Sequence, residues 1–300
     1  MKKILLIMVL CTVIIPPARG EYGYWSWSYW YCPVSYSEAR VYFQVWWGTA
    51  GSNVYVAGEG PLPDSNEGNT KEFPFSYLYG GPYSWALPWR KGGATAEIGY
   101  KGQLDPSPAS LKIVLVTVDE GITHVGSWWF AGLGYLQEAV MPWSLQSIGE
   151  GAFKSCKKLT YFECPDNVKT IGKSAFEGCN ALSTFDVYDL TGNYKISEAP
   201  LNIGNRAFAD CGSLKNLKIT ANSTLGDEVF KGSGLESVDL GNNVKFGSNV
   251  FQDCKNFKHF TVSAASTLGD CALANSSLET VTVNDNVTFG KYTFQNCKNL

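Results

Sequence analysis

Histidine is scarce in this chain, which contains only His124 and His259 among 300 residues. Zinc sites and acid–base catalysis that use imidazole need several groups close together, and these two residues lie far apart in the sequence. We interpret both as surface or turn residues. The stretch that begins at Asp64 is rich in oxygen-bearing side chains, but its glycine stands one place early for a calcium-binding EF-hand loop. We therefore expect no metal and no cofactor.

Charged residues are also few, at 17% of the chain, and lysine and arginine form no run. The formal net charge is −3. Because nucleic-acid-binding proteins contact phosphates through clustered basic residues, this composition excludes nucleic acid as a partner. Low charge combined with 14% aromatic residues is typical of a β-rich extracellular protein.

A long hydrophobic run is missing as well. The apolar stretch from Ile4 to Ile15 is shorter than the roughly 20 residues that cross a membrane, so no membrane span is expected. It follows Lys2 and Lys3 and precedes small residues, which is the pattern of a secretory signal peptide over residues 1–20. We expect cleavage before Glu21 and a mature protein that is secreted or held at the cell surface.

From residue 121 onward the chain repeats a glycine that is followed four positions later by an aromatic residue or leucine. An apolar residue precedes each of these glycines. Successive glycines are 21–23 residues apart, except for one interval of 32. Such a short unit cannot bury its apolar face alone and must stack on its neighbours. The pairs are Gly126 and Phe130, Gly149 and Phe153, Gly172 and Phe176, Gly204 and Phe208, Gly226 and Phe230, Gly247 and Phe251, Gly269 and Leu273, and Gly290 and Phe294.

Each unit also has a leucine or an equivalent residue, with apolar residues three and five positions later, as in Leu159, Phe162 and Cys164. Side chains alternate faces along a strand, so the residues between the apolar ones are expected to point outward. This outward row is either a merely solvated sheet or a binding surface, and both interpretations remain open. The binding interpretation selects Glu138, Tyr161, Glu163, Thr184, Asp186, Asn216, Lys218, Asp239, His259, Thr261 and Thr282.

The segments SIGEGAFKSCKKL, TIGKSAFEGCNAL and IGNRAFADCGSL resemble the BspA-like leucine-rich repeat family of secreted and cell-surface proteins. The resemblance covers residues 111–300, and the spacing of Leu111, Val114 and Val116 predicts the first strand of the array. It implies a β-rich solenoid, a right-handed superhelix of 21–23-residue units with one unit lengthened to 32. About eight repeats are expected, the last one incomplete. The resemblance also implies a non-catalytic adhesion or binding role.

One repeat is lengthened by residues 188–202, and an insertion of this size is expected to loop out of the stack. It is either neutral drift in a surface loop or part of a binding face. Further along, TLGD at 224–227 returns at 267–270, which is 43 residues later. A copied two-repeat block indicates an array extended by duplication rather than a site assembled from unique residues.

Five cysteines lie seven positions after a repeat glycine. Small, weakly polar side chains suit a tight interior turn, and free cysteine is commonly buried. We interpret these residues as a ladder of buried thiols, with disulfides between neighbouring turns as the alternative. The five are Cys156, Cys179, Cys211, Cys254 and Cys297.

Residues 21–110 precede the array and contain a dense aromatic patch, followed by an irregular loop rich in proline and glycine. A repeat stack needs a cover at its end, so one interpretation is an aromatic-rich β cap domain. In the other interpretation, exposed rings form a platform on which the apolar faces of sugar rings stack. Carbohydrate would then contact Trp25, Trp27, Trp30, Trp46 and Trp47.

The sequence shows no nucleophile, base and orienting group at a suitable spacing, so the chain is not expected to be an enzyme. The main hypothesis is adhesion or protein binding through the exposed strand face of the solenoid. Its partner would be an extracellular or host protein, a matrix component or a glycan. The sequence stops at Leu300 inside a repeat, which makes end-to-end self-association at an uncovered last turn a further hypothesis.

Overall fold

The structure is a computed structural model that describes residues 30–33, 40–48, 51–58, 60–61, 113–188 and 199–300. Before residue 113 it describes the backbone of the strands, and among their side chains only that of Val56. The predicted signal peptide, the proline- and glycine-rich loop, Trp25 and Trp27 lie outside the described residues. Residues 189–198 of the lengthened repeat lie outside them as well.

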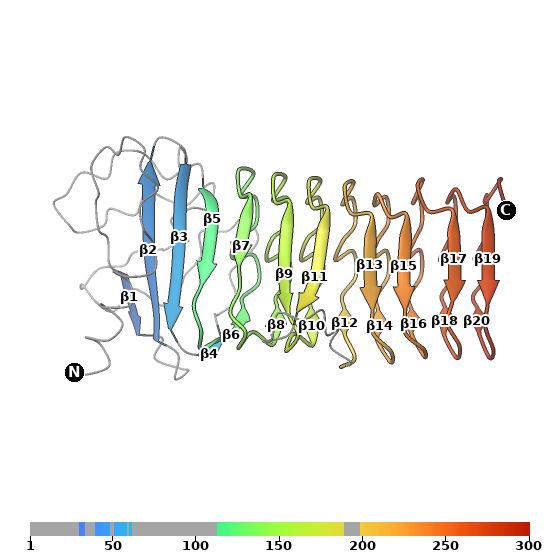
Figure 1. The fold of residues 1–300 in the computed structure, drawn as a ribbon, viewed down its shortest axis with the longest axis horizontal. Coiled ribbons are helices and arrows are strands. Elements are labelled where there is room, and N and C mark those ends of the chain that lie inside the picture. Colours follow the sequence, from blue (N-terminus) through green and yellow to red (C-terminus); the bar gives the residue numbers. More distant parts are fainter. Residues whose placement is uncertain (1–29, 34–39, 49–50, 59, 62–112, 189–198) are drawn as a thin grey trace.

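The described chain coils into a solenoid, and each turn from β5 onward contributes one long strand and one short strand (Figure 1). Strands of successive turns lie side by side and pair in parallel, as β9 does with β11 and β8 with β10. The predicted β-rich solenoid of short stacked units is confirmed. The long strands are β5 (Ile113–Val118), β7 (Glu138–Val140), β9 (Tyr161–Pro165), β11 (Thr184–Tyr188), β13 (Asn216–Ile219), β15 (Ser237–Leu240), β17 (His259–Val262) and β19 (Thr280–Val283).

The short strands form one unbroken nine-stranded sheet, whereas hydrogen bonding between the long strands is interrupted after β11 and after β15. The first interruption falls where the repeat is lengthened. The short strands are β4 (Gly60–Pro61), β6 (Ile122–Val125), β8 (Ser147–Ile148), β10 (Thr170–Ile171), β12 (Asn202–Ile203), β14 (Thr224–Leu225), β16 (Lys245–Phe246), β18 (Thr267–Leu268) and β20 (Thr288–Phe289).

Three strands precede the array, namely β1 (Trp30–Pro33), β2 (Arg40–Gly48) and β3 (Gly51–Gly58). They pair antiparallel with one another, and β3 then pairs in parallel with β5. Val56 of β3 is fully buried in the same core as Val116 of β5. The long-strand sheet therefore runs across the predicted domain boundary at residue 110 without a break.

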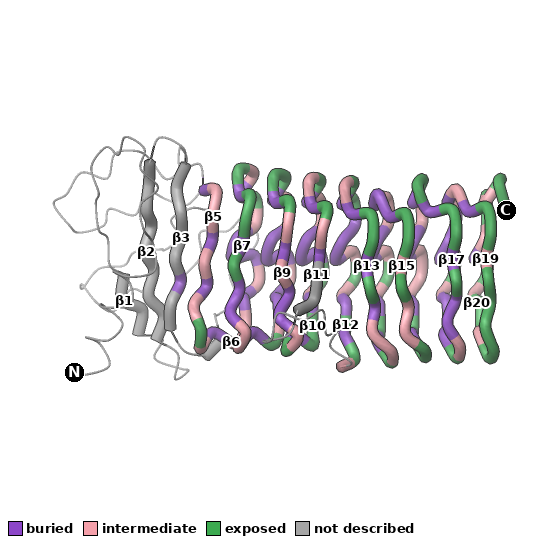
Figure 2. The backbone as a smooth tube through the Cα atoms, viewed as in Figure 1, coloured by how far each residue is buried: buried purple, intermediate pink, exposed green. Residues whose placement is uncertain are grey.

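A stacked column of phenylalanine rings forms the centre of the core. These rings come from the position four residues after each repeat glycine, and Phe153, Phe176 and Phe208 are fully buried. The ring centroids of Phe176 lie 5.3 Å from those of both neighbours, and the ring planes are within 4° of parallel. Figure 2 shows the buried segments recurring from turn to turn along the molecule. Stacked identical residues are the consequence of stacking nearly identical repeats.

The repeat glycines are required because successive turns approach closely there. A Cβ atom on Gly204 would lie 2.5 Å from the backbone nitrogen of Lys173, and one on Gly172 would lie 2.6 Å from that of Glu150. Neither glycine has a positive φ. Glycine is thus selected at these positions for its missing side chain and not for its conformational freedom.

The first long strand of the array is shifted by two residues from the predicted register. Val116 pairs with Ala139, so the buried set with the repeat spacing is Ile113, Val116 and Val118, and Val114 is only half-buried. The sequence pattern offered apolar residues at both spacings, because Leu111–Val118 is almost continuously apolar. A stretch whose only polar residues are Lys112 and Thr117 does not show which of its faces points inward.

The cysteine ladder lies inside the turns. Each of its five thiols donates a hydrogen bond to a backbone carbonyl of the preceding turn, as Cys179 Sγ does to the oxygen of Phe153 at 3.1 Å. All seven cysteines with described side chains are free thiols. Burial raises the pKa of the Cys156 and Cys211 thiols well above the ordinary value and that of Cys254 to about 11. These groups therefore stay protonated and can act as hydrogen-bond donors.

Candidate functional site

We define the front face as the outward side of the long strands from β7 to β19. Every residue selected from the sequence for this face lies on one of these strands. Each of them whose side chain the structure describes is exposed or half-buried. Tyr161, Glu163 and Thr184 are half-buried, and Asp186 lies on β11 without a described side chain. The exposed ones are Glu138, Asn216, Lys218, Asp239, His259, Thr261 and Thr282.

Parallel register brings the selected residues together in rows that run along the solenoid. Glu138 is the register partner of Tyr161, which is in turn the partner of Thr184. Two residues further along the strands, Glu163 is the partner of Asp186. Neighbouring parallel strands lie about 4.8 Å apart, so partner residues on paired strands occupy adjacent positions of the face within each group of paired strands.

Hydrogen bonds between turns hold several front-face side chains in place. Ser237 Oγ donates to Asn216 Oδ1 at 2.7 Å, and His259 Nδ1 lies 2.8 Å from Thr280 Oγ1. His259 is exposed, as interpreted from the sequence, whereas His124 is half-buried on β6 with its Nδ1 2.7 Å from Ser147 Oγ. Each histidine thus contacts a hydroxyl of the next turn.

Ion pairs connect the later turns on this face, between Lys218 and Asp239, and directly beside it, at the residues that precede β13, β15, β17 and β19. Lys215 lies 3.0 Å from Glu236, Lys218 lies 3.4 Å from Asp239, and Lys258 lies 2.8 Å from Glu279. The hydrogen bond between Lys258 and Glu279 raises the pKa of the lysine and lowers that of the carboxyl group. All of these side chains are exposed, and exposed pairs contribute little to stability. Their main effect is to neutralise the charge of this part of the front face.

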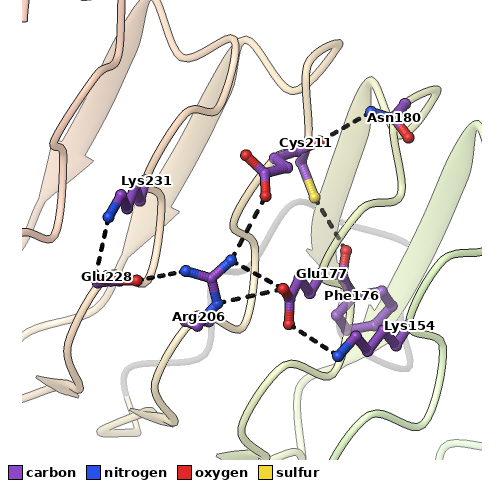
Figure 3. A network of polar contacts seen from close by, with 9 residues as sticks. Lys154, Phe176, Glu177, Asn180, Arg206, Cys211, Glu228 and Lys231 are labelled. Carbon is purple, nitrogen blue, oxygen red and sulfur yellow. Dashed lines mark hydrogen bonds and ion pairs between the residues drawn. The ribbon is translucent and has the colours of Figure 1, made fainter.

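Sequence reasoning missed a second polar network, which lies on another side of the turns (Figure 3). Arg206 donates to Glu177 of the preceding repeat at 2.9 Å and also to Glu228 of the following one. Lys154 lies 3.5 Å from Glu177, and Lys231 lies 3.1 Å from Glu228. The signal available in the sequence was one charge of alternating sign in each successive repeat, with Lys154 and Glu177 five positions after their glycines and Arg206 and Glu228 two positions after theirs. The lengthened interval hid it.

The network around Arg206 joins the turns on either side of the lengthened repeat. We therefore interpret it as a structural contact that stabilises the stacking of these turns. Burial by itself would raise the pKa of both Glu177 and Glu228, but hydrogen bonds from Arg206 and from neighbouring groups outweigh burial and lower it. A carboxyl whose pKa falls on folding stabilises the fold above its unfolded pKa. That contribution is lost as the pH drops through the lower, folded value.

We expect Arg206→Met to lower the free energy of unfolding by about 1–2 kcal/mol at pH 7, because charged hydrogen bonds to two partly buried carboxylates are lost. The difference between variant and wild type should shrink as the pH falls below the ordinary glutamate pKa, where both carboxylates become protonated. Urea unfolding followed by circular dichroism at neutral and acidic pH measures both quantities. Lys215→Met, which breaks one exposed pair, is the control and should change stability by less than about 0.5 kcal/mol. A loss that is the same at both pH values would contradict this account.

Within the described part of the chain, no group of three or more histidine, cysteine, aspartate or glutamate residues is placed to hold a metal ion. No helix among the described residues is long and apolar enough to cross a membrane. Trp30 lies on β1 and Trp46 and Trp47 lie on β2, but their side chains are not described. Carbohydrate binding by the aromatic patch therefore stays a prediction.

Among solved structures, the chain is similar to a leucine rich repeat protein of T. pallidum, with 22% identity, a TM-score of 0.43, and coverage of 62% of this chain and 78% of that one. The pneumococcal vaccine antigen PcpA is 15% identical, with a TM-score of 0.42, and the match covers 87% of this chain and 78% of PcpA. A leucine-rich repeat protein from Bacteroides ovatus is 14% identical, with a TM-score of 0.33 and coverage of 94% and 81%.

No curated protein matches the sequence. The model of the BspA type leucine rich repeat region matches in six copies, over residues 109–200 and 189–300. These matches span more than half of the 300 residues and coincide with the stacked turns. The chain belongs to the BspA-type leucine-rich repeat family.

Proposed function

We propose that this protein is a secreted or cell-surface adhesion or binding protein that contacts a partner protein through the front face, without catalysis. The observation that carries this proposal is the front face itself. Side chains of many types, among them Glu138, Tyr161, Lys218 and His259, lie exposed or half-buried on the long strands, and Glu138 and Tyr161 are in register. Membership of a repeat family built on stacked turns supports a scaffold role.

The mechanism is the addition of many modest contacts on a pre-ordered surface. Inter-turn hydrogen bonds and the packed core already hold the face rigid, so little side-chain and backbone entropy is lost on binding. Tyr161 and His259 are the side chains best suited to act as local anchors, because large rings contribute most to interface energetics. Affinity would then depend on how many turns the partner spans.

The test is a triple variant, Tyr161→Ala, Asp186→Ala and His259→Ala, compared with wild type against a partner captured from extracellular and matrix proteins. We expect weaker binding without unfolding, because His259 is exposed, Tyr161 is only half-buried, and neither belongs to the buried core. The matched control is Thr170→Ala, Thr224→Ala and Thr267→Ala, which changes exposed residues of the short strands β10, β14 and β18. Unchanged binding by the front-face variant, or an equal loss of binding in the control variant, would contradict the proposal.

A further inference from the structure

The front face is not uniform in charge. On its first three strands, β7, β9 and β11, the charged residues are Glu138, Glu163 and Asp186, and these strands contain no lysine or arginine. The turns that follow carry both signs, and there lysines and carboxylates of neighbouring turns pair with each other, as described above. The face is therefore divided into an acidic first part and a second part that neutralises its own charge.

Two carboxylates of the first part, Glu138 and Glu163, have no internal counter-charge. Among the described residues, neither Glu138, which is exposed, nor Glu163, which is half-buried, lies in an ion pair. Asp186 occupies the register position beside Glu163 on the next strand. Like charges at directly opposite positions of a sheet destabilise it. A cation supplied from outside would offset the unpaired charge of Glu138 and Glu163.

Apolar and aromatic surface lies among these carboxylates. Val140 of β7 is 42% exposed. Tyr161 is the register partner of Glu138, and Glu163 lies two residues further along the same strand and therefore on the same face. Tyr161 is thus bordered on two sides by residues that carry carboxylates. A mixed surface of this kind is too polar for a purely hydrophobic partner.

An arginine side chain fits this arrangement better than any other residue. Its guanidinium group stacks on an aromatic ring and can donate two parallel hydrogen bonds to a carboxylate at the same time. The protein itself uses related chemistry nearby, where Lys158 Nζ lies 4.7 Å from the ring centroid of Tyr135 in the loop before β7. An apolar residue next to the arginine would contact Val140.

We propose that β7, β9 and β11 form the docking segment of the front face and bind an extended basic segment of a partner protein, in which arginine alternates with apolar residues. This inference rests on the function proposed above and narrows its location and its partner. The arginine lies against Tyr161 between Glu138 and Glu163, and the turns from β13 onward extend the surface without adding net charge.

The test uses the full chain and a short synthetic peptide in which arginine alternates with valine, with binding measured by fluorescence polarisation at low and high salt. We expect the double variant Glu138→Gln and Glu163→Gln to lose about tenfold in affinity, since each charged contact at a partly exposed site contributes up to roughly a factor of five. The matched control, Glu236→Gln and Glu279→Gln, alters the net charge of the protein equally but changes carboxylates that are already paired. It should bind within about twofold of wild type.

Equal losses in the two double variants would overturn the proposal, because binding would then follow net charge and not this segment. Equal or tighter binding of a matched glutamate–valine peptide, or no binding of the arginine peptide at all, would overturn it as well. The proposed function is judged separately. If the arginine peptide fails but the triple variant with changes at Tyr161, Asp186 and His259 still loses its captured partner, only the docking segment is wrong.

Discussion

Replacing Phe176 by alanine is expected to lower the free energy of unfolding by about 3–5 kcal/mol, the range found when a buried aromatic ring is removed from a packed core. Phe176 is fully buried, and its ring lies within 5.3 Å, between centroids, of the rings of Phe153 and Phe208 in the neighbouring turns. It also meets Phe162 edge-on at 4.8 Å. The surrounding rings belong to other turns that are fixed by their own hydrogen bonds, so the space cannot close easily.

Because each turn of a solenoid contacts only its neighbours, the loss of stability should appear first as local opening of the turns around Phe176. Urea unfolding gives the overall loss, and hydrogen exchange shows where it is. The amide of Phe153, which donates to the carbonyl of Ala175 at 2.8 Å, should exchange faster than amides several turns away. Phe289→Ala is the control, since that ring is 41% exposed, and it should cost less than about 1 kcal/mol. Similar losses of unfolding free energy at Phe176 and Phe289 would show that the stacked column of phenylalanine rings is not the centre of the core.

Replacing Gly204 by alanine is the second change for which we expect a large effect, a loss of at least about 3 kcal/mol. The added Cβ would lie 2.5 Å from the backbone nitrogen of Lys173 and 2.8 Å from the carbonyl carbon of Gly172. Backbone atoms of a hydrogen-bonded turn cannot move aside as the end of a flexible side chain can. The two turns must therefore separate locally, which weakens the pairing of β10 with β12 as well as the packing below it.

Gly134→Ala is the matched control for this substitution. No atom lies within 4 Å of a Cβ at that position, and Gly134 has no positive φ. Alanine there should leave stability unchanged or raise it by about 0.5 kcal/mol, because it restricts the unfolded chain. Thermal unfolding of both variants measures the contrast. If the two glycines proved equally replaceable, close approach between turns would not be the reason for the repeated glycine.

The interior of this protein could be predicted from particular residues, because the core of each repeat packs against the equivalent residues of the neighbouring repeats. Once Phe153, Phe176 and Phe208 recur at the same position of stacked units, each must meet its own counterpart in the next turn, and the ring contacts confirm this. The outward row from Glu138 to Thr282 followed from strand alternation in the same way. The prediction failed at Val114, where an almost continuously apolar stretch gave no alternation to follow.

The polar network around Arg206 could not be predicted, because it depends on how turns of unequal length align. Glu177 and Arg206 are 29 residues apart, which is not a repeat spacing, yet they are hydrogen-bonded because the lengthened repeat returns to the stack in register. Pairing of Lys218 with Asp239 likewise depends on the reach of side chains across turns, which the pattern of apolar residues does not contain.

The sequence alone determined the length of the repeat, the residues that fill its interior and the strands whose outward residues form a surface. It could do so because a one-dimensional stack converts a period along the chain directly into neighbours in space. Only the tertiary structure decided why the repeated residue is glycine, where hydrogen bonding between the long strands is interrupted, and which front-face carboxylates lack a partner. These features depend on distances between atoms of different turns, and such distances are set by how the turns are offset when they pack.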